Sequence, residues 1–273
     1  MPHAMIEGNR MWYEIKGSGP HVLQIGGAGF AHLNFTRVTD EMGKHFTVID
    51  TDQIGNGHSD KPERKYTIDS WADEVAELLD LIGIERTHVH SSSTGGMIAI
   101  RLASRYPEKV DRLILGATAA KFDFMCKAQF EVRKALARAY GVDAKPLAYD
   151  LVTIALSAEY LDSPAGGEPM VEEVARLLGQ MTTAENWCSA CEAMTEADLR
   201  DDLPKIQSPT LVVCGELDNN TPLVQAPSGA GMRYIAEHIP NARLEVIEGA
   251  GHTTLLETPE RMTELTVDFL TQD

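Results

Sequence analysis

The chain has 273 residues, of which 43% are hydrophobic, and it suits one large folded domain or one domain with a sizeable insertion. A formal net charge of −17, with lysines and arginines scattered, excludes the basic surface that nucleic-acid binding requires. No apolar run approaches the roughly 18 residues needed to span a membrane, and the first residues lack a secretory signal, so we expect a cytoplasmic protein.

Short apolar runs and helical patterns alternate along most of the chain. Residues 5–15 predict a β-hairpin with Gly8 and Asn9 at its turn. Apolar residues recur with a period of about 3.6 residues in other segments, which predicts helices between strands. This alternation indicates an α/β domain with a mainly parallel sheet. The predicted buried strands are 22–25, 46–50, 87–90, 113–115, 210–214 and 244–247, and the predicted helices are 68–82, 95–106 and 259–270.

The segment 91–95, Ser-Ser-Ser-Thr-Gly, lies where a predicted strand ends and a predicted helix begins. A serine at such a junction is typical of a nucleophile elbow, a strained G-x-S-x-G turn. Its flanking residues must be small because helix and strand approach closely, and Ser93 fits best, with Ser91 and Gly95 two positions to either side. We therefore predict Ser93 as a nucleophile, and the alternative is a strand-to-loop junction rich in hydroxyls.

The alternation of strands and helices breaks between 119 and 203, where the composition is helical and no run resembles a strand. We predict a core domain of 1–118 and 204–273, with 119–203 as a helical lid over the carboxyl ends of the strands. The alternative is a structural subdomain without a role in substrate choice. The candidate pocket residues, which core packing of the lid would also explain, are Gly27, Phe122, Phe124, Met125, Trp187 and Met194.

An activated serine needs a base, and the base needs an orienting acid. The last two predicted strands are followed by Asp218 and by His252, which stands in a glycine-rich loop. Because the carboxyl ends of parallel strands meet at one edge of a sheet, both side chains can reach Ser93. We predict Asp218 as the acid and His252 as the base, with Glu216 and Asp50 as competing acids.

An oxyanion hole needs two backbone N–H donors. The N–H of Thr94 follows the predicted nucleophile at the start of a helix. The loop 26–29, Gly-Gly-Ala-Gly, follows the first buried strand and suits close backbone approach to a ligand, so Ala28 is the second expected donor. A plain turn is the alternative reading of these glycines.

The four cysteines and nine histidines offer no clear metal site. Cys188 and Cys191 form a C-x-x-C without a second ligand pair at zinc-like spacing, so we interpret them as small residues on one helix face. His88 and His90 alternate on a strand and share a face, but no carboxylate can be placed beside them. No metal or organic cofactor is predicted.

Several of these segments together resemble the α/β-hydrolase superfamily, and the likeness covers nearly the whole chain. Residues 52–59 resemble its D-x-x-G-x-G-x-S loop, and 106–110 resemble its Y-P-x-x-V segment. The approach to Asp218 and the segment 251–260 around His252 are similar to those that carry the superfamily's acid and histidine. Two positions depart from the pattern, since Ser91 stands where a glycine is usual and Gly26 where a histidine is usual.

This resemblance implies the α/β-hydrolase fold and a Ser93–His252–Asp218 triad acting on a small molecule. The segment 187–200, leading into 203–206, is similar to the lid exit of 3-oxoadipate enol-lactonases, and Thr221 and Pro222 fit that group too. We expect a serine hydrolase of a small carboxylic ester or lactone. The alternatives are a hydrolase of a carbon–carbon bond in a vinylogous diketone, a lyase, or a ligand-binding relative that has lost efficient catalysis.

Overall fold

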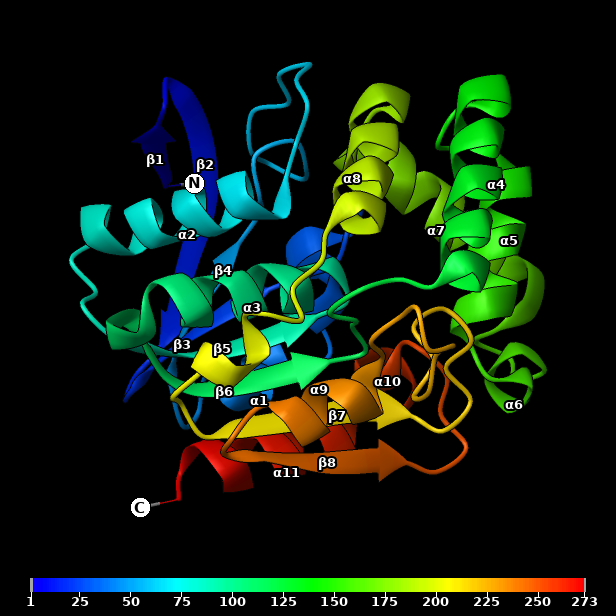
Figure 1. Cartoon of the computed structure of the whole chain (residues 1–273). Helices are drawn as coiled ribbons and strands as arrows, with labels where there is room; N and C mark the ends of the chain where they lie inside the picture. Colours follow the sequence, from blue (N-terminus) through cyan, green and yellow to red (C-terminus); the bar gives the residue numbers. More distant parts are fainter. Residues whose placement is uncertain (1, 273) are drawn as a thin grey trace.

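The computed structural model describes residues 2–272, in which a sheet with the order β1-β2-β4-β3-β5-β6-β7-β8 runs through the molecule (Figure 1). The six strands from β4 to β8 in this order pair in parallel, and β1 and β2 add an antiparallel edge. The mainly parallel sheet expected from the alternating pattern is confirmed. The strands are β1 (His3–Ile6), β2 (Asn9–Gly17), β3 (His21–Ile25), β4 (Thr47–Thr51), β5 (Thr87–Ser92), β6 (Val110–Gly116), β7 (Thr210–Gly215) and β8 (Ala242–Ile247).

Two edges of the sheet differ in detail from the prediction. The β1–β2 turn is made by Glu7 and Gly8, both with positive φ, one residue earlier than expected. The last strand was predicted to be buried, but β8 is the other edge of the sheet and its Val246 is 40% exposed. A strand at the sheet edge has a neighbour on one side alone, which leaves more of its surface to solvent.

Helices cover both faces of the sheet and enclose a hydrophobic core on each. One face carries α2 (Ile68–Leu81), α3 (Thr94–Arg105) and α9 (Met232–His238), and the other carries α1 (Thr39–Met42) and α11 (Pro259–Leu270) (Figure 1). Short helices connect the remaining loops: η1 (Ala31–Phe35), η2 (Pro107–Lys109), η3 (Leu203–Lys205) and α10 (Thr254–Glu257).

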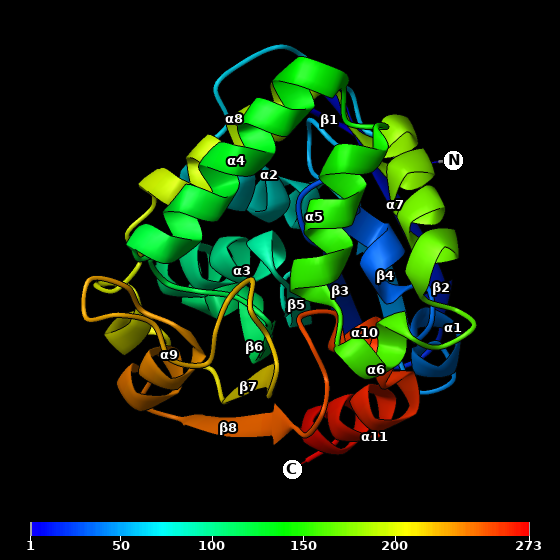
Figure 2. The ribbon, with the colours of Figure 1, turned by 90° about the vertical axis from the view of Figure 1, so that its right-hand side faces the viewer.

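A group of helices lies between β6 and β7 in the chain and stands beyond the carboxyl ends of the strands (Figure 2). Within it, α4 packs against α8 and α5 packs against α7. We call this group the lid; its helices are α4 (Phe124–Tyr140), α5 (Lys145–Ala155), α6 (Ala158–Leu161), α7 (Gly167–Met181) and α8 (Ala184–Glu196). In the described part of the chain no helix combines the length and the apolar character that crossing a membrane requires.

Candidate active site

Ser93 lies at the junction of β5 and α3, in a backbone conformation that side chains rarely adopt. Its φ is 56° and its ψ is −121°. The turn is held by close packing, because a Cβ at Gly95 would lie 1.9 Å from the carbonyl oxygen of Ile25 on β3. The elbow therefore depends on a glycine two residues after the serine, as its sequence spacing predicted.

Ser91, which replaces a glycine of the family pattern, is fully buried and lies on β5. Its hydroxyl donates a hydrogen bond to the carbonyl oxygen of Ile114 on β6, at 2.7 Å. The side chain thus fits the space beside β6 and is satisfied there. The elbow forms with serine at this position.

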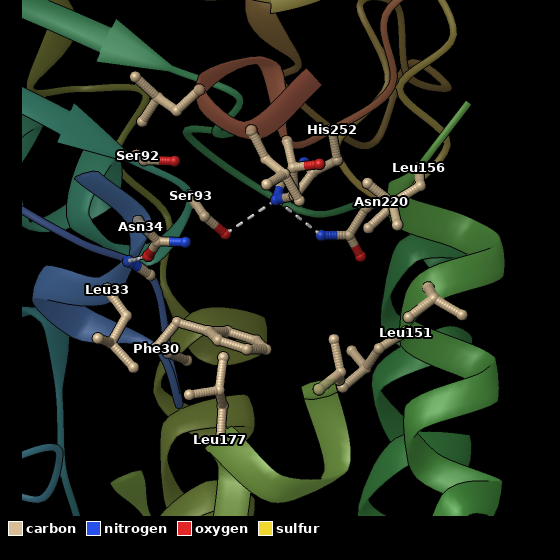
Figure 3. A pocket seen from close by; sticks show the side chains of 18 of the residues that line it. Phe30, Leu33, Asn34, Ser92, Ser93, Leu151, Leu156, Leu177, Asn220 and His252 are labelled. Atoms are coloured by element: carbon tan, nitrogen blue, oxygen red, sulfur yellow. Dashed lines mark hydrogen bonds between the residues drawn. The ribbon is translucent and has the colours of Figure 1, made fainter. Parts of the chain in front are cut away.

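Ser93, His252 and Asp218 form one chain of close contacts (Figure 3 shows the first two). His252 Nε2 lies 3.2 Å from Ser93 Oγ, and His252 Nδ1 lies 2.9 Å from Asp218 Oδ2. The histidine loop follows β8 and the aspartate loop follows β7, so adjacent parallel strands deliver both groups to the same edge of the sheet.

Asp218 is buried, and each of its oxygens is occupied by donors. The backbone N–H groups of Asn220 and Thr221 donate to Oδ1, both at 2.8 Å, and the Thr221 hydroxyl donates to Oδ2 at 2.8 Å. Burial by itself would raise the pKa of Asp218, but the charge and hydrogen bond of His252 and the Thr221 donors outweigh it and lower the pKa. The carboxylate is therefore kept ionised beside the imidazole.

Glu216 and Asp50, the alternative candidates for the acid that orients His252, lie elsewhere in the structure. Glu216 is exposed and its carboxylate accepts the backbone N–H of Gly249 at 3.0 Å. Asp50 is buried in β4, where burial raises its pKa to about 6. Neither contacts His252 through a hydrogen bond or ion pair in residues 2–272.

The loop after β3 is held by side chains from three other segments. Asn34 Oδ1 accepts the N–H of Gly27 at 2.6 Å, and Asn56 Oδ1 accepts that of Gly29 at 3.1 Å. The N–H of Ala28 lies 3.2 Å from Thr94 Oγ1, so the two predicted oxyanion donors belong to segments in contact.

Gly26 has no room for the histidine that is usual in the family. A Cβ there would lie 1.8 Å from the carbonyl oxygen of Ala31, so any side chain would displace the backbone. In this chain the amides of Asn34 and Asn56 hold the loop instead. The two asparagines are visible in the sequence, but their local sequence does not indicate which backbone N–H groups they contact.

A cavity of about 330 Å³ opens beside Ser93 and His252, between the sheet and the lid (Figure 3). Its surface is mostly apolar. Of the predicted pocket residues, Gly27, Trp187 and Met194 line it. Phe122 does not line it, because its side chain is buried against the ring of Phe130. Phe124 and Met125 do not line it either, since they are 79% and 66% exposed at the start of α4. That prediction is corrected because α4 turns other residues, such as Phe130 and Arg133, toward the cavity.

Two polar residues that line the cavity, Asn220 and Arg133, were not predicted from the sequence. Asn220 Nδ2 lies 3.1 Å from His252 Nε2, the same atom that faces Ser93. Arg133 on α4 is 1% exposed and donates from Nη1 to Asn220 Oδ1 at 2.6 Å. A buried arginine in a helix rich in charged residues has no local signature, because its burial depends on the packing of the whole lid.

Two groups of residues have side chains of the kinds that bind metals: the cysteines of α8 and one cluster of two histidines and an aspartate. Burial raises the pKa of both Cys188 and Cys191, which lie on α8, so their thiols stay protonated. Ligand atoms of His32, Asp52 and His58 all lie within 4.8 Å of one another. Asp52 already accepts the backbone N–H groups of both histidines, at 3.1 and 2.8 Å, which joins two loops by hydrogen bonds.

Comparison with known proteins places these features in context. Residues 20–138 match a family model described as the alpha/beta hydrolase fold, and 175–273 match one described as TAP-like protein. The chain is 34% identical to 3-oxoadipate enol-lactonase 2 of Acinetobacter baylyi, over 80% of this chain and 75% of that protein. It is 29% identical to 2-hydroxymuconate semialdehyde hydrolase of Pseudomonas sp. strain CF600, over 94% and 86%. The crystal structure of the enol-lactonase from Burkholderia xenovorans LB400 superposes with a TM-score of 0.86 at 30% identity, covering 99% of this chain and 100% of that one.

Proposed function

The chain belongs to the α/β-hydrolase family, and on that premise we propose that it cleaves a small carboxylic ester or lactone through an acyl-enzyme on Ser93. The observation that carries the proposal is the continuous contact from Asp218 through His252 to Ser93 Oγ at the wall of an apolar cavity. A relative named as an enol-lactonase supports the same reaction class.

In the proposed reaction, Ser93 Oγ attacks the substrate carbonyl carbon while His252 Nε2 accepts the hydroxyl proton. Asp218 stabilises the imidazolium through Nδ1. When the tetrahedral intermediate collapses, the bond to the alcohol oxygen breaks and His252 gives that oxygen its proton. A water molecule, deprotonated by His252, then attacks the acyl-enzyme, and the acid leaves as Ser93 recovers its proton.

The negative charge on the intermediate requires donors near Ser93. We assign this role to the N–H groups of Ala28 and Thr94. Thr94 is the first residue of α3, and an N–H in the first turn has no acceptor within its helix. The Ala28 N–H faces Thr94 Oγ1 at 3.2 Å, a long contact that a developing oxyanion would replace. By analogy with other oxyanion holes, each donor lowers the barrier by roughly 3 kcal/mol.

The test is the change Ser93→Ala. We expect hydrolysis of p-nitrophenyl butyrate to fall by about three orders of magnitude or more, because the nucleophile is removed, while thermal unfolding is unchanged. Ser92→Ala is the matched control, since Ser92 is the adjacent serine and also lines the cavity. Labelling by a fluorophosphonate should be lost with Ser93→Ala alone. Ester turnover that persists in the Ser93→Ala protein would contradict the proposal.

A second reaction is favoured by the relative named as a semialdehyde hydrolase, which suggests cleavage of a carbon–carbon bond in a vinylogous diketone. The same nucleophile and base would serve either reaction. A panel of aryl esters, lactones and ring-cleavage dienes decides between them. A rate constant kcat/KM at least about a hundredfold higher for the dienes than for any ester would make the second reaction the main one.

A further inference from the structure

Arg133 is a charged residue among those that line the cavity, and its side chain is almost wholly out of contact with solvent. The side chain comes from α4 and is 1% exposed. Its Nε donates to Asp150 Oδ2 at 2.7 Å and its Nη1 to Asn220 Oδ1 at 2.6 Å. The guanidinium carbon lies 5.1 Å from the centre of the Phe130 ring. These contacts hold the group in one orientation.

The third nitrogen of this group, Nη2, is buried and has no hydrogen-bond partner. The indole Nε1 of Trp187, on the neighbouring helix α8, is also buried without a hydrogen-bond partner. Among the described residues that line the cavity, these are the buried side-chain polar atoms without a partner, and both are N–H donors. A cavity wall that lacks acceptors for its donors is complementary to a ligand that brings acceptor oxygens.

The donors come from neighbouring parts of two packed helices. Residues one position further along α4 and α8 touch, with Cys188 Sγ 3.8 Å from the carbonyl oxygen of Lys134. A carboxylate is the acceptor that a guanidinium recognises best, because two oxygens can meet its planar set of donors. Asp150, the ion-pair partner of Arg133, keeps 23% of its side chain exposed, so solvent screens its charge more than that of the arginine.

Arg133 is also tied to the reacting groups. Asn220 joins the guanidinium to His252 Nε2, so one side chain separates Arg133 from the proposed base. Because the guanidinium cannot accept a hydrogen bond, it fixes the Asn220 amide with its oxygen toward Arg133 and its nitrogen toward His252. A ligand group bound at Arg133 would therefore lie a short arm away from a carbonyl held at Ser93.

Resting on the proposed function, we propose that the substrates are anionic, and that a carboxylate on a short arm from the scissile carbonyl binds to Arg133, with the indole N–H of Trp187 as a second donor. Arg133 then determines substrate choice. The other arginine of the cavity, Arg37, is exposed at its rim and has water as a competing partner. It is the matched control for loss of one positive charge.

The experiment compares mono-p-nitrophenyl esters of succinic, glutaric and adipic acids with the same esters whose free carboxyl is methylated. In the unmodified protein we expect kcat/KM for at least one charged ester to exceed that of its methylated partner by about tenfold or more. Arg133→Gln should lower this ratio by about tenfold or more, through KM, and Arg133→Lys should restore part of it. Arg37→Gln should leave the ratio within about threefold.

Three results would overturn the inference. They are a preference for the methylated esters at all three lengths, a ratio unaffected by Arg133→Gln, or a ratio lost in Arg37→Gln instead. Should Arg133→Gln fail to fold, glutarate as a competitive inhibitor of neutral-ester hydrolysis, set against the uncharged diamide of glutaric acid, answers the question in the unmodified protein. Equal inhibition by the two compounds counts against a carboxylate site.

Failure of this inference is distinguishable from failure of the proposed function. If neutral esters are cleaved in a Ser93-dependent way without any preference for charge, the carboxylate site alone is wrong. If no ester is cleaved, the proposed reaction is wrong, and calorimetric binding of glutarate to the Ser93→Ala protein still tests the site. We expect saturable binding that Arg133→Gln weakens by about tenfold, and no binding would overturn the inference.

Discussion

Single residues at the elbow combine strain with close packing. Ser93 holds a positive φ, which costs a non-glycine residue of the order of 1–3 kcal/mol, and the surrounding contacts have to impose it. Gly95 permits the approach of α3 to β3, and a Cβ at Gly27 would stand 3.0 Å from Ser93 Cβ. Ser91, by contrast, is a residue for which the fold has made room, since its hydroxyl is bonded to β6.

Ser91→Gly should therefore change stability more than activity. The variant loses one buried hydrogen bond and gains backbone freedom in the unfolded chain, which together cost about 1–2 kcal/mol. The elbow keeps small residues on both sides, so kcat/KM should stay within about tenfold of the parent. Urea unfolding and ester hydrolysis measure the two effects. A loss or gain of several hundredfold in kcat/KM would reveal a catalytic part for the Ser91 hydroxyl.

Among the elements, β5 carries both the elbow and a buried histidine. His90 is 1% exposed, and its ring meets that of Phe35 edge-on with centroids 5.0 Å apart. Burial lowers the pKa of His90 to about 3. The alternating positions His88 and His90 share one face of the sheet, as the sequence predicted, and both pack on phenylalanines of the same core. A carboxylate does lie beside His88, contrary to the sequence interpretation, since Asp111 Oδ2 is 3.3 Å from His88 Nδ1.

The pH dependence of stability follows from the lowered pKa of His90. Between about pH 6.5 and about 3 the unfolded chain binds a proton on this histidine and the folded protein does not, so the free energy of unfolding falls as pH decreases, by up to about 1.4 kcal/mol per pH unit. Asp50, with a pKa raised to about 6, contributes in the opposite direction. Its contribution cancels when the parent protein is compared with a variant of His90, because both contain Asp50.

His90→Leu should therefore lose less stability than the parent between pH 7 and pH 5, by about 2 kcal/mol. Urea unfolding at pH 7, 6 and 5 gives the three free energies for each protein. His45→Leu, at an exposed histidine, should follow the parent curve. Parallel curves for His90→Leu and the parent would mean that His90 is not the group that titrates.

For the whole molecule, the lid and the sheet meet at the loop that carries His252. The N–H of His252 donates to the carbonyl oxygen of Ala155 at 2.7 Å, at the end of α5. Glu257 accepts the N–H groups of Gly251 at 3.1 Å and of Ser157 at 3.0 Å, one on either side of this junction. The position of His252 therefore depends on contacts with both the sheet domain and the lid.

Glu257→Ala would leave two amide groups at that junction without an acceptor. We expect a loss of about 1–3 kcal/mol in the free energy of unfolding and a decrease of about tenfold in kcat, because the loop no longer holds His252 at Ser93. Thermal unfolding and ester turnover check both. Glu248→Ala, at an exposed glutamate in the same loop, should stay within about 0.5 kcal/mol of the parent. Unchanged kcat in the destabilised Glu257→Ala protein would show that the junction supports the fold alone.

The sequence by itself determined the alternation of strands and helices and the order of Ser93, Asp218 and His252 at the ends of strands. Both are local signals, and a parallel sheet brings strand ends together whatever the loops contain. Only the tertiary structure decided that Phe124 and Met125 face solvent, that Arg133 faces the cavity and that Asn34 and Asn56 hold the loop beside Gly26. The side of a lid helix that becomes buried depends on how it packs against distant segments, and no periodicity within the helix encodes that contact.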